Sequence, residues 1–146
     1  MDLSVHIRDA IVTHARRCLP EEACGLLAVD ETGCIRAAYA LTNAEHSSTA
    51  FTIDPDDHFR ALTDAEAMGW RIGGVFHSHP VTAAVPSCTD VAKMLESGWL
   101  HVIVGFADRE QPEVRGWRIE GGVATEDIPG VASPVASAAE EGGGCP

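Results

Sequence analysis

The most informative part of the chain is the stretch His77-Ser78-His79-Pro80-Val81-Thr82-Ala83-Ala84-Val85-Pro86-Ser87-Cys88-Thr89-Asp90. It follows an apolar segment, residues 70–77, which we expect to be a short central β-strand. His77 and His79 stand two residues apart at the end of that strand. Because side chains alternate along a strand, both imidazoles project from the same face. Two imidazoles placed in this way can occupy adjacent positions around one Zn²⁺ ion.

Asp90 follows the histidine pair across a loop, in the first turn of a helix expected over residues 87–96. Pro80 forces the chain off the strand and helps this loop to return Asp90 toward the histidines. The Asp90 carboxylate can supply a third protein ligand and leave the fourth tetrahedral position to water. Three protein ligands plus water distinguish a catalytic zinc site from a closed structural one. The stretch therefore predicts one zinc ion per chain.

Ser87 and Asp90 also have a purely local interpretation. Ser-x-x-acid at the start of a helix is typical of a capping box, with Ser87 at the N-cap and Asp90 at N3. In that arrangement Asp90 binds backbone N–H groups and stays away from the histidines. The capping box does not explain the histidine pair and Pro80 immediately upstream, and a capping Ser87 is compatible with an Asp90 that faces a metal ion.

A hydrolytic zinc site also needs a general base to take a proton from water. The best candidate is Glu22, in the segment Pro20-Glu21-Glu22-Ala23-Cys24-Gly25, at the point where a first helix gives way to a strand. That position can overhang a cleft. Glu21 is equally eligible by position, and a solvated loop glutamate is the alternative for both.

The rest of the chain predicts one α/β domain of the α+β type, with a mixed, largely antiparallel sheet and about three helices. We expect this domain to span residues 1–128 and an Ala/Ser/Pro/Gly-rich tail, residues 129–146, to be flexible. The expected elements are a helix over 5–19, a hairpin of strands 23–29 and 35–41, a helix over 54–68 with Asp54 as N-cap and Pro55 at N1, the strand 70–77, the helix 87–96, strands 100–107 and 114–119 paired with each other, and at most one more short strand after Gly122.

Composition narrows the class of protein. The chain has 146 residues and a net charge of −12, from 10 basic and 22 acidic residues, which argues against nucleic acid or an anionic membrane as a partner. No apolar run is long enough to span a membrane, and the N-terminus lacks the pattern of a signal peptide. The five cysteines show no CxxC spacing, so we expect reduced thiols in a cytoplasmic protein, with Cys24 and Cys88 as small buried side chains.

These residues carry a family resemblance. The pattern is similar to the signature of the JAMM (MPN+) zinc metallopeptidases. It consists of Glu22, then His77-Ser78-His79-Pro80 far downstream, then six residues, then Ser87-x-x-Asp90. The resemblance covers about residues 3–122 and implies a JAMM/MPN-like fold of the cytidine-deaminase-like type. It also implies zinc held by His77, His79 and Asp90, with Glu22 rather than Glu21 as acid/base. Ser87 would then donate a hydrogen bond to the tetrahedral oxyanion.

Within that family the chain resembles the compact bacterial members that act on ubiquitin-like sulfur-carrier proteins. This likeness rests on four short sequence segments, His14-Ala15-Arg16-Arg17, Glu22-Ala23-Cys24-Gly25, Thr42-Asn43-Ala44-Glu45 and Pro86-Ser87-Cys88-Thr89-Asp90. The likeness implies a zinc-dependent (iso)peptidase that cleaves after a carrier's C-terminal Gly-Gly, either to release cysteine or to trim extra residues. Asn43, Phe51 and Thr52 are candidates for a substrate-binding edge. A homodimer is left open.

Three other functions compete with this interpretation. A non-catalytic scaffold of the MPN type would be expected to lack a ligand, and none is missing here. A nucleic-acid-associated relative of the fold is disfavoured by the charge and by Ser78. A zinc deaminase would need a PCxxC element after the histidine. The C-terminal residues Gly142-Gly143-Gly144-Cys145-Pro146 resemble an unprocessed carrier terminus, which raises the hypothesis that the tail mimics the substrate.

Overall fold

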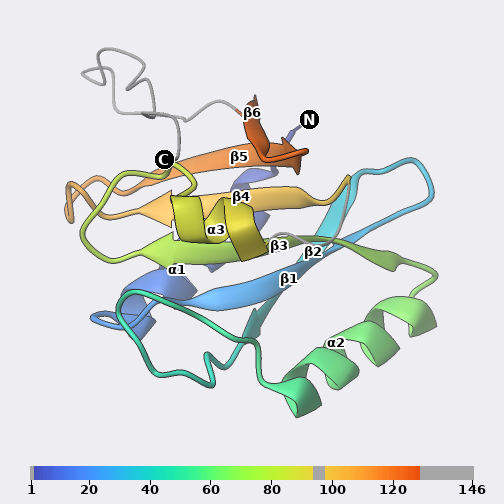
Figure 1. Ribbon diagram of the computed structural model, residues 1–146. Helices are drawn as coiled ribbons and strands as arrows, with labels where there is room; N and C mark the ends of the chain where they lie inside the picture. The colour runs from blue at the N-terminus through green and yellow to red at the C-terminus, as the bar shows by residue number, and fades with distance from the viewer. Residues whose placement is uncertain (1, 94–97, 129–146) are drawn as a thin grey trace.

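The computed structural model describes residues 2–93 and 98–128 of the chain (Figure 1). Within these residues, six strands form one sheet in the order β2-β1-β3-β4-β5-β6, accompanied by three helices. The elements in chain order are α1 (Val5–Cys18), β1 (Cys24–Val29), β2 (Ile35–Leu41), α2 (Pro55–Ala67), β3 (Arg71–His79), α3 (Cys88–Lys93), β4 (Leu100–Gly105), β5 (Glu113–Glu120) and β6 (Val123–Ile128).

The sheet is mixed, as the sequence predicts. β3 and β4 run parallel, whereas the other four neighbouring pairs of strands are antiparallel. The expected hairpin of β1 with β2 and the expected pairing of β4 with β5 are both present. β3 lies inside the sheet between β1 and β4, so both of its edges are paired and its C-terminal end is held on two sides.

The two faces of the sheet carry different helices. Phe76 packs in one core cluster with Ile11 and Ala15 of α1. Its neighbour Val75 packs on the opposite face, in a cluster with Ala61 of α2. Figure 1 shows α3 in front of the sheet and α1 behind it. Because side chains alternate along β3, the residues two and four positions after Val75 project on the face that bears α2 and α3.

The N-termini of α1 and α2 are capped by side chains. The Ser4 side chain accepts a hydrogen bond from the Ile7 N–H, and Asp54 accepts from the N–H groups of Asp56 and Asp57. Pro55 occupies the first helical position, where its missing N–H costs nothing. The cap predicted at Asp54 is therefore confirmed.

β3 extends two residues further than the sequence predicts, and the one short strand expected after Gly122 is present as β6. β3 continues to His79 because its parallel partner continues to Gly105, and the His79 carbonyl accepts a hydrogen bond from Phe106 at 3.0 Å. β6 is a six-residue strand paired with β5, with Ile128 opposite Gly116. The predicted helix over 87–96 is described as far as Lys93. The expected tail, residues 129–146, lies outside the described residues.

No helix in the described parts of the chain is both long enough and apolar enough to cross a membrane.

Candidate metal centre

His77, His79 and Asp90 converge on one point at the C-terminal end of β3. The Nε2 atoms of His77 and His79 are 3.1 Å apart. The Oδ2 atom of Asp90, delivered by the first turn of α3, lies 3.2 Å from the first and 3.1 Å from the second. All three side chains are buried or nearly so.

These three atoms have the spacing of ligands around a tetrahedral ion. Ligand atoms about 2.0–2.1 Å from a zinc ion lie about 3.3–3.4 Å from one another in tetrahedral geometry. The triangle in the structure is slightly tighter than one face of such a tetrahedron, so a small outward movement of each group would admit the ion. Two imidazoles and one carboxylate are also a donor set that zinc accepts.

The His79 ring is oriented for this task by the backbone. Its Nδ1–H donates a hydrogen bond to the Ala83 carbonyl at 2.9 Å, which fixes the neutral tautomer with a lone pair on Nε2. That lone pair is directed at the triangle. Burial lowers the pKa of His79, but hydrogen bonds to Asp90 and to the Ala83 carbonyl outweigh burial and raise it.

The His77 ring is more enclosed. Only 1% of the residue is exposed, and the Phe51 ring stacks on the imidazole with centroids 4.8 Å apart and planes 23° from parallel. Burial lowers the pKa of His77 and so favours the neutral imidazole that a metal ion requires. Its Nδ1 atom is buried without a hydrogen-bond partner in the described structure.

Asp90 and Ser87 form the capping box and serve the triangle at the same time. The Asp90 N–H donates to Ser87 Oγ at 3.0 Å, and the Ser87 N–H donates to Asp90 Oδ2 at 2.9 Å. Burial would raise the pKa of Asp90, but hydrogen bonds with His77 and His79 hold it well below its usual range. Asp90 thus forms the capping box and also lies against the two histidines, so the capping box does not keep it away from them.

Glu22 completes the cluster from the segment that precedes β1. One of its carboxylate oxygens lies within 4.8 Å of the ligand atoms of His77 and His79. The residue is only 5% exposed, and burial raises the pKa of its carboxyl to about 7, with Asp90 adding to the rise and His79 opposing it. A carboxylate with a pKa near 7 is suited to exchange protons at neutral pH. Glu21 lies outside this cluster and forms a 3.3 Å ion pair with His46.

The backbone around Glu22 is held on both sides. The Glu22 N–H donates to the Ser47 carbonyl at 2.8 Å, and the Glu22 carbonyl accepts from the Asn43 side chain at 3.1 Å. The next residue, Ala23, donates its N–H to Ser78 Oγ at 2.8 Å. Ser78 sits between the two histidines but points to the opposite face of β3. The sequence alone does not indicate this contact, because it depends on how β3 pairs with β1 and the residue before it.

The three candidates for substrate binding lie beside the cluster, in the loop that follows β2. The Asn43 side chain is buried and hydrogen-bonded within that loop, with its amide N–H donating to Ala50 as well as to Glu22. The Thr52 hydroxyl donates to Glu45 at 2.8 Å. Phe51 covers His77. In the structure, therefore, Asn43 and Thr52 shape the loop and Phe51 packs on the metal-ligand candidate.

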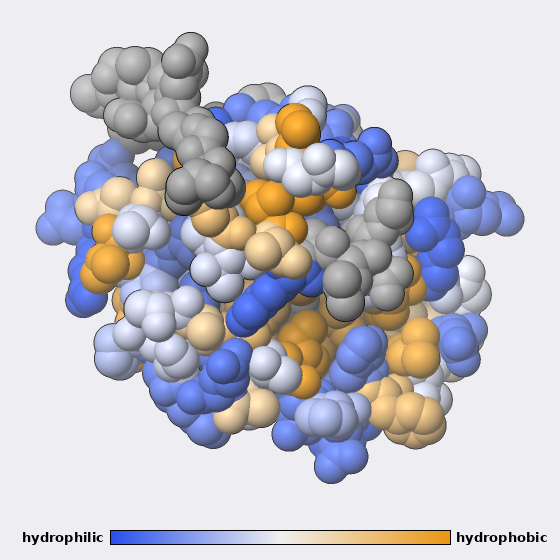
Figure 2. Space-filling view, viewed as in Figure 1, coloured by the Kyte–Doolittle hydropathy of each residue, from blue (hydrophilic) through white to orange (hydrophobic). Residues whose placement is uncertain are grey.

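The cluster lies on the face of the sheet that bears α2 and α3. Ser87 is exposed there, and its hydroxyl can still donate a hydrogen bond outward while its oxygen accepts from Asp90. Figure 2 shows this face, where hydrophilic side chains predominate and apolar side chains are visible between the regions of α3 and α2.

The cysteines near the cluster differ from expectation in one case. Cys24, opposite His77 in the sheet, is a buried free thiol, and burial raises its pKa to about 12. Cys88, next to Ser87, is exposed and disulfide-bonded, so the prediction of a buried reduced thiol is wrong there. Cys18 and Cys34 are free.

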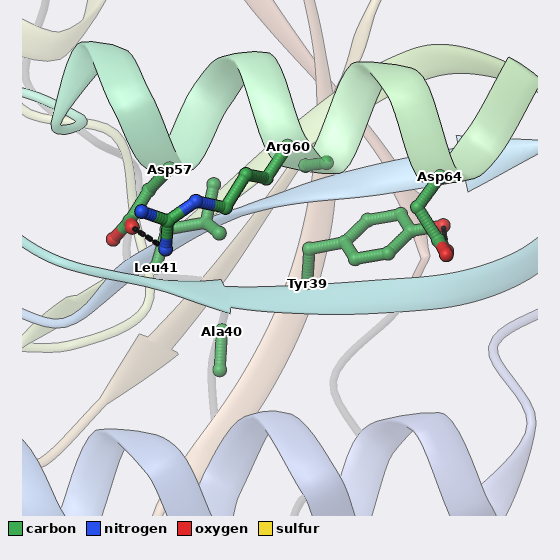
Figure 3. A pocket seen from close by; sticks show the side chains of 7 residues that line it. Tyr39, Ala40, Leu41, Asp57, Arg60 and Asp64 are labelled. Carbon is green, nitrogen blue, oxygen red and sulfur yellow. Dashed lines mark hydrogen bonds and ion pairs between the residues drawn. The ribbon is translucent and has the colours of Figure 1, made fainter.

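A separate hollow of about 470 Å³ lies between α2 and the edge strand β2 (Figure 3). Its charged groups already have partners. Arg60 pairs with Asp57 at 3.7 Å, and the Tyr39 hydroxyl donates to Asp64 at 2.6 Å. This hollow therefore lacks the converging, unsatisfied polar groups of a reactive site.

The chain is similar in sequence to several known proteins. Residues 4–120 match the family model described as prokaryotic homologs of the JAB domain. The chain is 40% identical over 124 residues to the CysO-cysteine peptidase of Mycobacterium tuberculosis, covering 82% of each sequence. It is 33% identical over 109 residues to the desampylase of Haloferax volcanii, covering 70% of this chain and 78% of the relative.

A solved structure is also similar in fold. The solution structure of a protein from Desulfitobacterium hafniense superposes with a TM-score of 0.78 at 30% sequence identity. The match covers 86% of this chain and 88% of the other.

Proposed function

Because this chain belongs to the family of prokaryotic homologs of the JAB domain and is a JAMM-type hydrolase, we propose that it is a zinc-dependent peptidase whose substrate is a ubiquitin-like sulfur-carrier protein. We propose that it cleaves the bond after the carrier's C-terminal Gly-Gly. The activity would serve sulfur transfer or cysteine biosynthesis in the cytoplasm.

One observation carries the proposal. Two imidazole nitrogens and one carboxylate oxygen form a triangle with edges of 3.1, 3.2 and 3.1 Å, and a buried Glu22 lies beside it. In our assignment His77, His79 and Asp90 hold one zinc ion, and Glu22 remains outside the ligand set. A non-catalytic scaffold would have no need for a buried carboxylate at that position.

In this proposal each residue of the site has a separate chemical role. A bound zinc ion supplies a Lewis acid that polarises the scissile carbonyl and makes water more acidic. Glu22 takes a proton from the attacking water and passes it to the leaving amine, as its raised pKa allows. Ser87 donates its hydroxyl hydrogen to the oxygen that becomes negatively charged, while the Asp90 N–H holds the Ser87 oxygen in place.

The shape of the site supports a glycine-rich substrate. Phe51 lies directly on His77, and the Asn43 side chain is hydrogen-bonded to the backbone of Glu22, so this loop packs against the cluster. A Gly-Gly terminus has no side chains to accommodate beside these groups. The relatives named as a CysO-cysteine peptidase and a desampylase both support a carrier protein as the substrate.

Two reactions are compatible with this site. The enzyme either releases one cysteine that has been joined to the carrier, or trims a longer extension so that the Gly-Gly end can be activated. Both break the same amide bond and require the same residues.

Mass spectrometry of carrier proteins tests the proposal. Carriers that end in Gly-Gly plus cysteine, or in Gly-Gly plus several residues, are incubated with the wild-type enzyme, with Glu22→Ala and with chelator-treated enzyme. We expect cleavage directly after Gly-Gly by the wild type alone, and the preferred carrier identifies the reaction. If no carrier is cleaved although one zinc ion is bound per chain, the proposed substrate is wrong and a binding role is favoured.

A further inference from the structure

Three imidazole nitrogens are buried without a hydrogen-bond partner on the face of the sheet that bears the metal centre. They are Nδ1 of His77 and both ring nitrogens of His101. Each residue is only 1% exposed. Buried polar groups are nearly always hydrogen-bonded. In the described part of the structure, however, no donor or acceptor lies within hydrogen-bonding distance of these three nitrogens.

The sheet places the two rings near each other. In the parallel pairing of β3 with β4, His101 lies opposite Val75, and His77 lies opposite Ile103. His101 therefore projects from the same face as His77, on the neighbouring strand and one pleat earlier. The separation is short enough that charge on His77 or on Asp90 acts on His101.

The two candidate histidine ligands differ in their outer support. A histidine that binds a metal ion usually donates its other ring N–H to a carbonyl, carboxylate or water, which fixes the ring and its tautomer. His79 has such a partner in the Ala83 carbonyl. His77 has Phe51 stacked on its ring, but its Nδ1 atom has no acceptor.

We propose that His101 is a positioning residue for His77, and that one buried water links the Nδ1–H of His77 to a ring nitrogen of His101. Neutral His101 offers one acceptor and one donor, so it can receive the water's hydrogen while the water oxygen accepts from His77. This link would hold His77 in the tautomer whose Nε2 faces Asp90. The inference rests on the proposed role of His77 as a zinc ligand.

Zinc affinity of the full chain provides the first test. Competition with a chromophoric chelator measures the Kd for Zn²⁺ of the wild type, His101→Leu and His101→Gln. We expect His101→Leu to weaken zinc binding by about 10- to 100-fold, the usual effect of removing an outer-shell partner. His101→Gln, which retains a hydrogen-bonding side chain, should restore most of the affinity. Val104→Ala, on the same strand but the opposite face, controls for a general loss of core packing.

Imidazole NMR provides a readout that does not depend on activity or on the stability of a variant. Long-range ¹H–¹⁵N spectra of the metal-free wild type should show His77 as the Nδ1–H tautomer with a slowly exchanging proton. His77 found as the Nε2–H tautomer would overturn the proposal, and so would unchanged zinc affinity in His101→Leu. A wild type that binds no zinc would instead remove the proposed function, and this inference with it.

Discussion

Ser78 connects β3 to the segment that holds Glu22, the proposed acid/base, through a side chain that faces away from the candidate metal centre. Its Oγ accepts the Ala23 N–H at 2.8 Å, and its own N–H donates to the Ala23 carbonyl at 3.1 Å. Ser78 is fully buried, so water cannot replace the hydroxyl. The position of Glu22, one residue before Ala23, therefore depends on Ser78.

We predict that Ser78→Ala lowers the free energy of unfolding by about 1–3 kcal/mol, because the buried Ala23 N–H loses one acceptor. It should also lower kcat by up to about 100-fold, since a small displacement of a catalytic group is costly. Urea denaturation and carrier cleavage measure the two effects. Ser4→Ala, which removes the cap of α1, is the control and should reduce stability without changing kcat. Equal kcat in both variants would contradict the role of Ser78.

His101 gives a prediction for acid stability. Burial lowers its pKa from 6.5 to about 4, with the charge of His77 adding to the effect. The unfolded chain takes up a proton at this residue near pH 6.5, whereas the folded chain resists protonation until about pH 4. The stability that neutral His101 contributes is therefore complete above pH 6.5 and is lost as the pH falls toward 4. The pKa difference corresponds to about 3 kcal/mol.

Urea denaturation of the zinc-free protein between pH 7 and pH 4 measures this loss. The wild type should lose more stability over that range than His101→Leu, by about 3 kcal/mol. His58→Leu, a change at an exposed histidine of α2, should behave as the wild type does. Parallel pH profiles for the wild type and His101→Leu would show that His101 is not the group responsible.

At the scale of secondary-structure elements, the end of β4 and the loop after β3 fit together closely at Gly105. A Cβ atom there would overlap the backbone of Ala83 and Ala84. The same segment provides the Ala83 carbonyl that orients His79, and the Ala84 carbonyl accepts from the Trp117 indole N–H at 2.9 Å. The absence of a side chain at Gly105 thus sets the position of a metal-ligand candidate.

We predict that Gly105→Ala lowers both thermal stability and zinc affinity, because the loop must move away from β4 and withdraw the acceptor from His79. The loss of affinity should be about 10-fold or more. Gly116→Ala is a matched control, since a Cβ there meets the Ile128 side chain on β6, away from the metal centre. Gly116→Ala should lower thermal stability but leave zinc affinity unchanged. Equal zinc affinity in Gly105→Ala and the wild type would show that His79 does not need this loop.

The sequence predicted the elements of this site better than the contacts between them. The spacing of His77 and His79, the proline after them and the capping pattern at Ser87 are local signals, and each is realised in the structure. The links from Ser78 to Ala23 and from Phe51 to His77 join distant segments. They depend on strand register and on the path of the loop after β2, which no local pattern specifies. The place of His101 near His77 depends in the same way on the register between β3 and β4.

At the scale of the whole molecule, the two faces of the sheet differ in what they carry. α1 and its core cluster cover one face, and the other face, with α2 and α3, carries the candidate metal centre. The order of helices and strands along the chain indicated a mixed sheet, but it did not indicate which face each helix covers. The face that each helix covers is known only from the packing in the structure, where α1 contacts one set of alternating side chains of β1 and β3.

We propose that residues 1–128 suffice for folding and catalysis. A chain ending at Ile128 should still fold and should retain the carrier-cleavage rate of the full-length protein. A faster rate in the shortened chain would instead indicate that the Gly-Gly-Gly-Cys-Pro terminus competes for the substrate site. Mass spectrometry of the zinc-loaded full-length protein complements this test, because a tail that stays intact after long incubation argues against self-processing. Loss of folding in the shortened chain would contradict the proposed domain boundary.

The central claim is that His77, His79 and Asp90 bind the zinc ion, whereas Glu22 does not bind it and acts as the base. The zinc content of two variants tests this claim most directly. Zinc bound per chain is measured for the wild type, Asp90→Ala and Glu22→Gln, together with carrier cleavage. We predict one zinc ion in the wild type and in Glu22→Gln, little in Asp90→Ala, and a fall in kcat of at least about 100-fold in Glu22→Gln. Loss of zinc in Glu22→Gln with retention in Asp90→Ala would contradict the account, because it would make Glu22 a ligand and leave the site without its base.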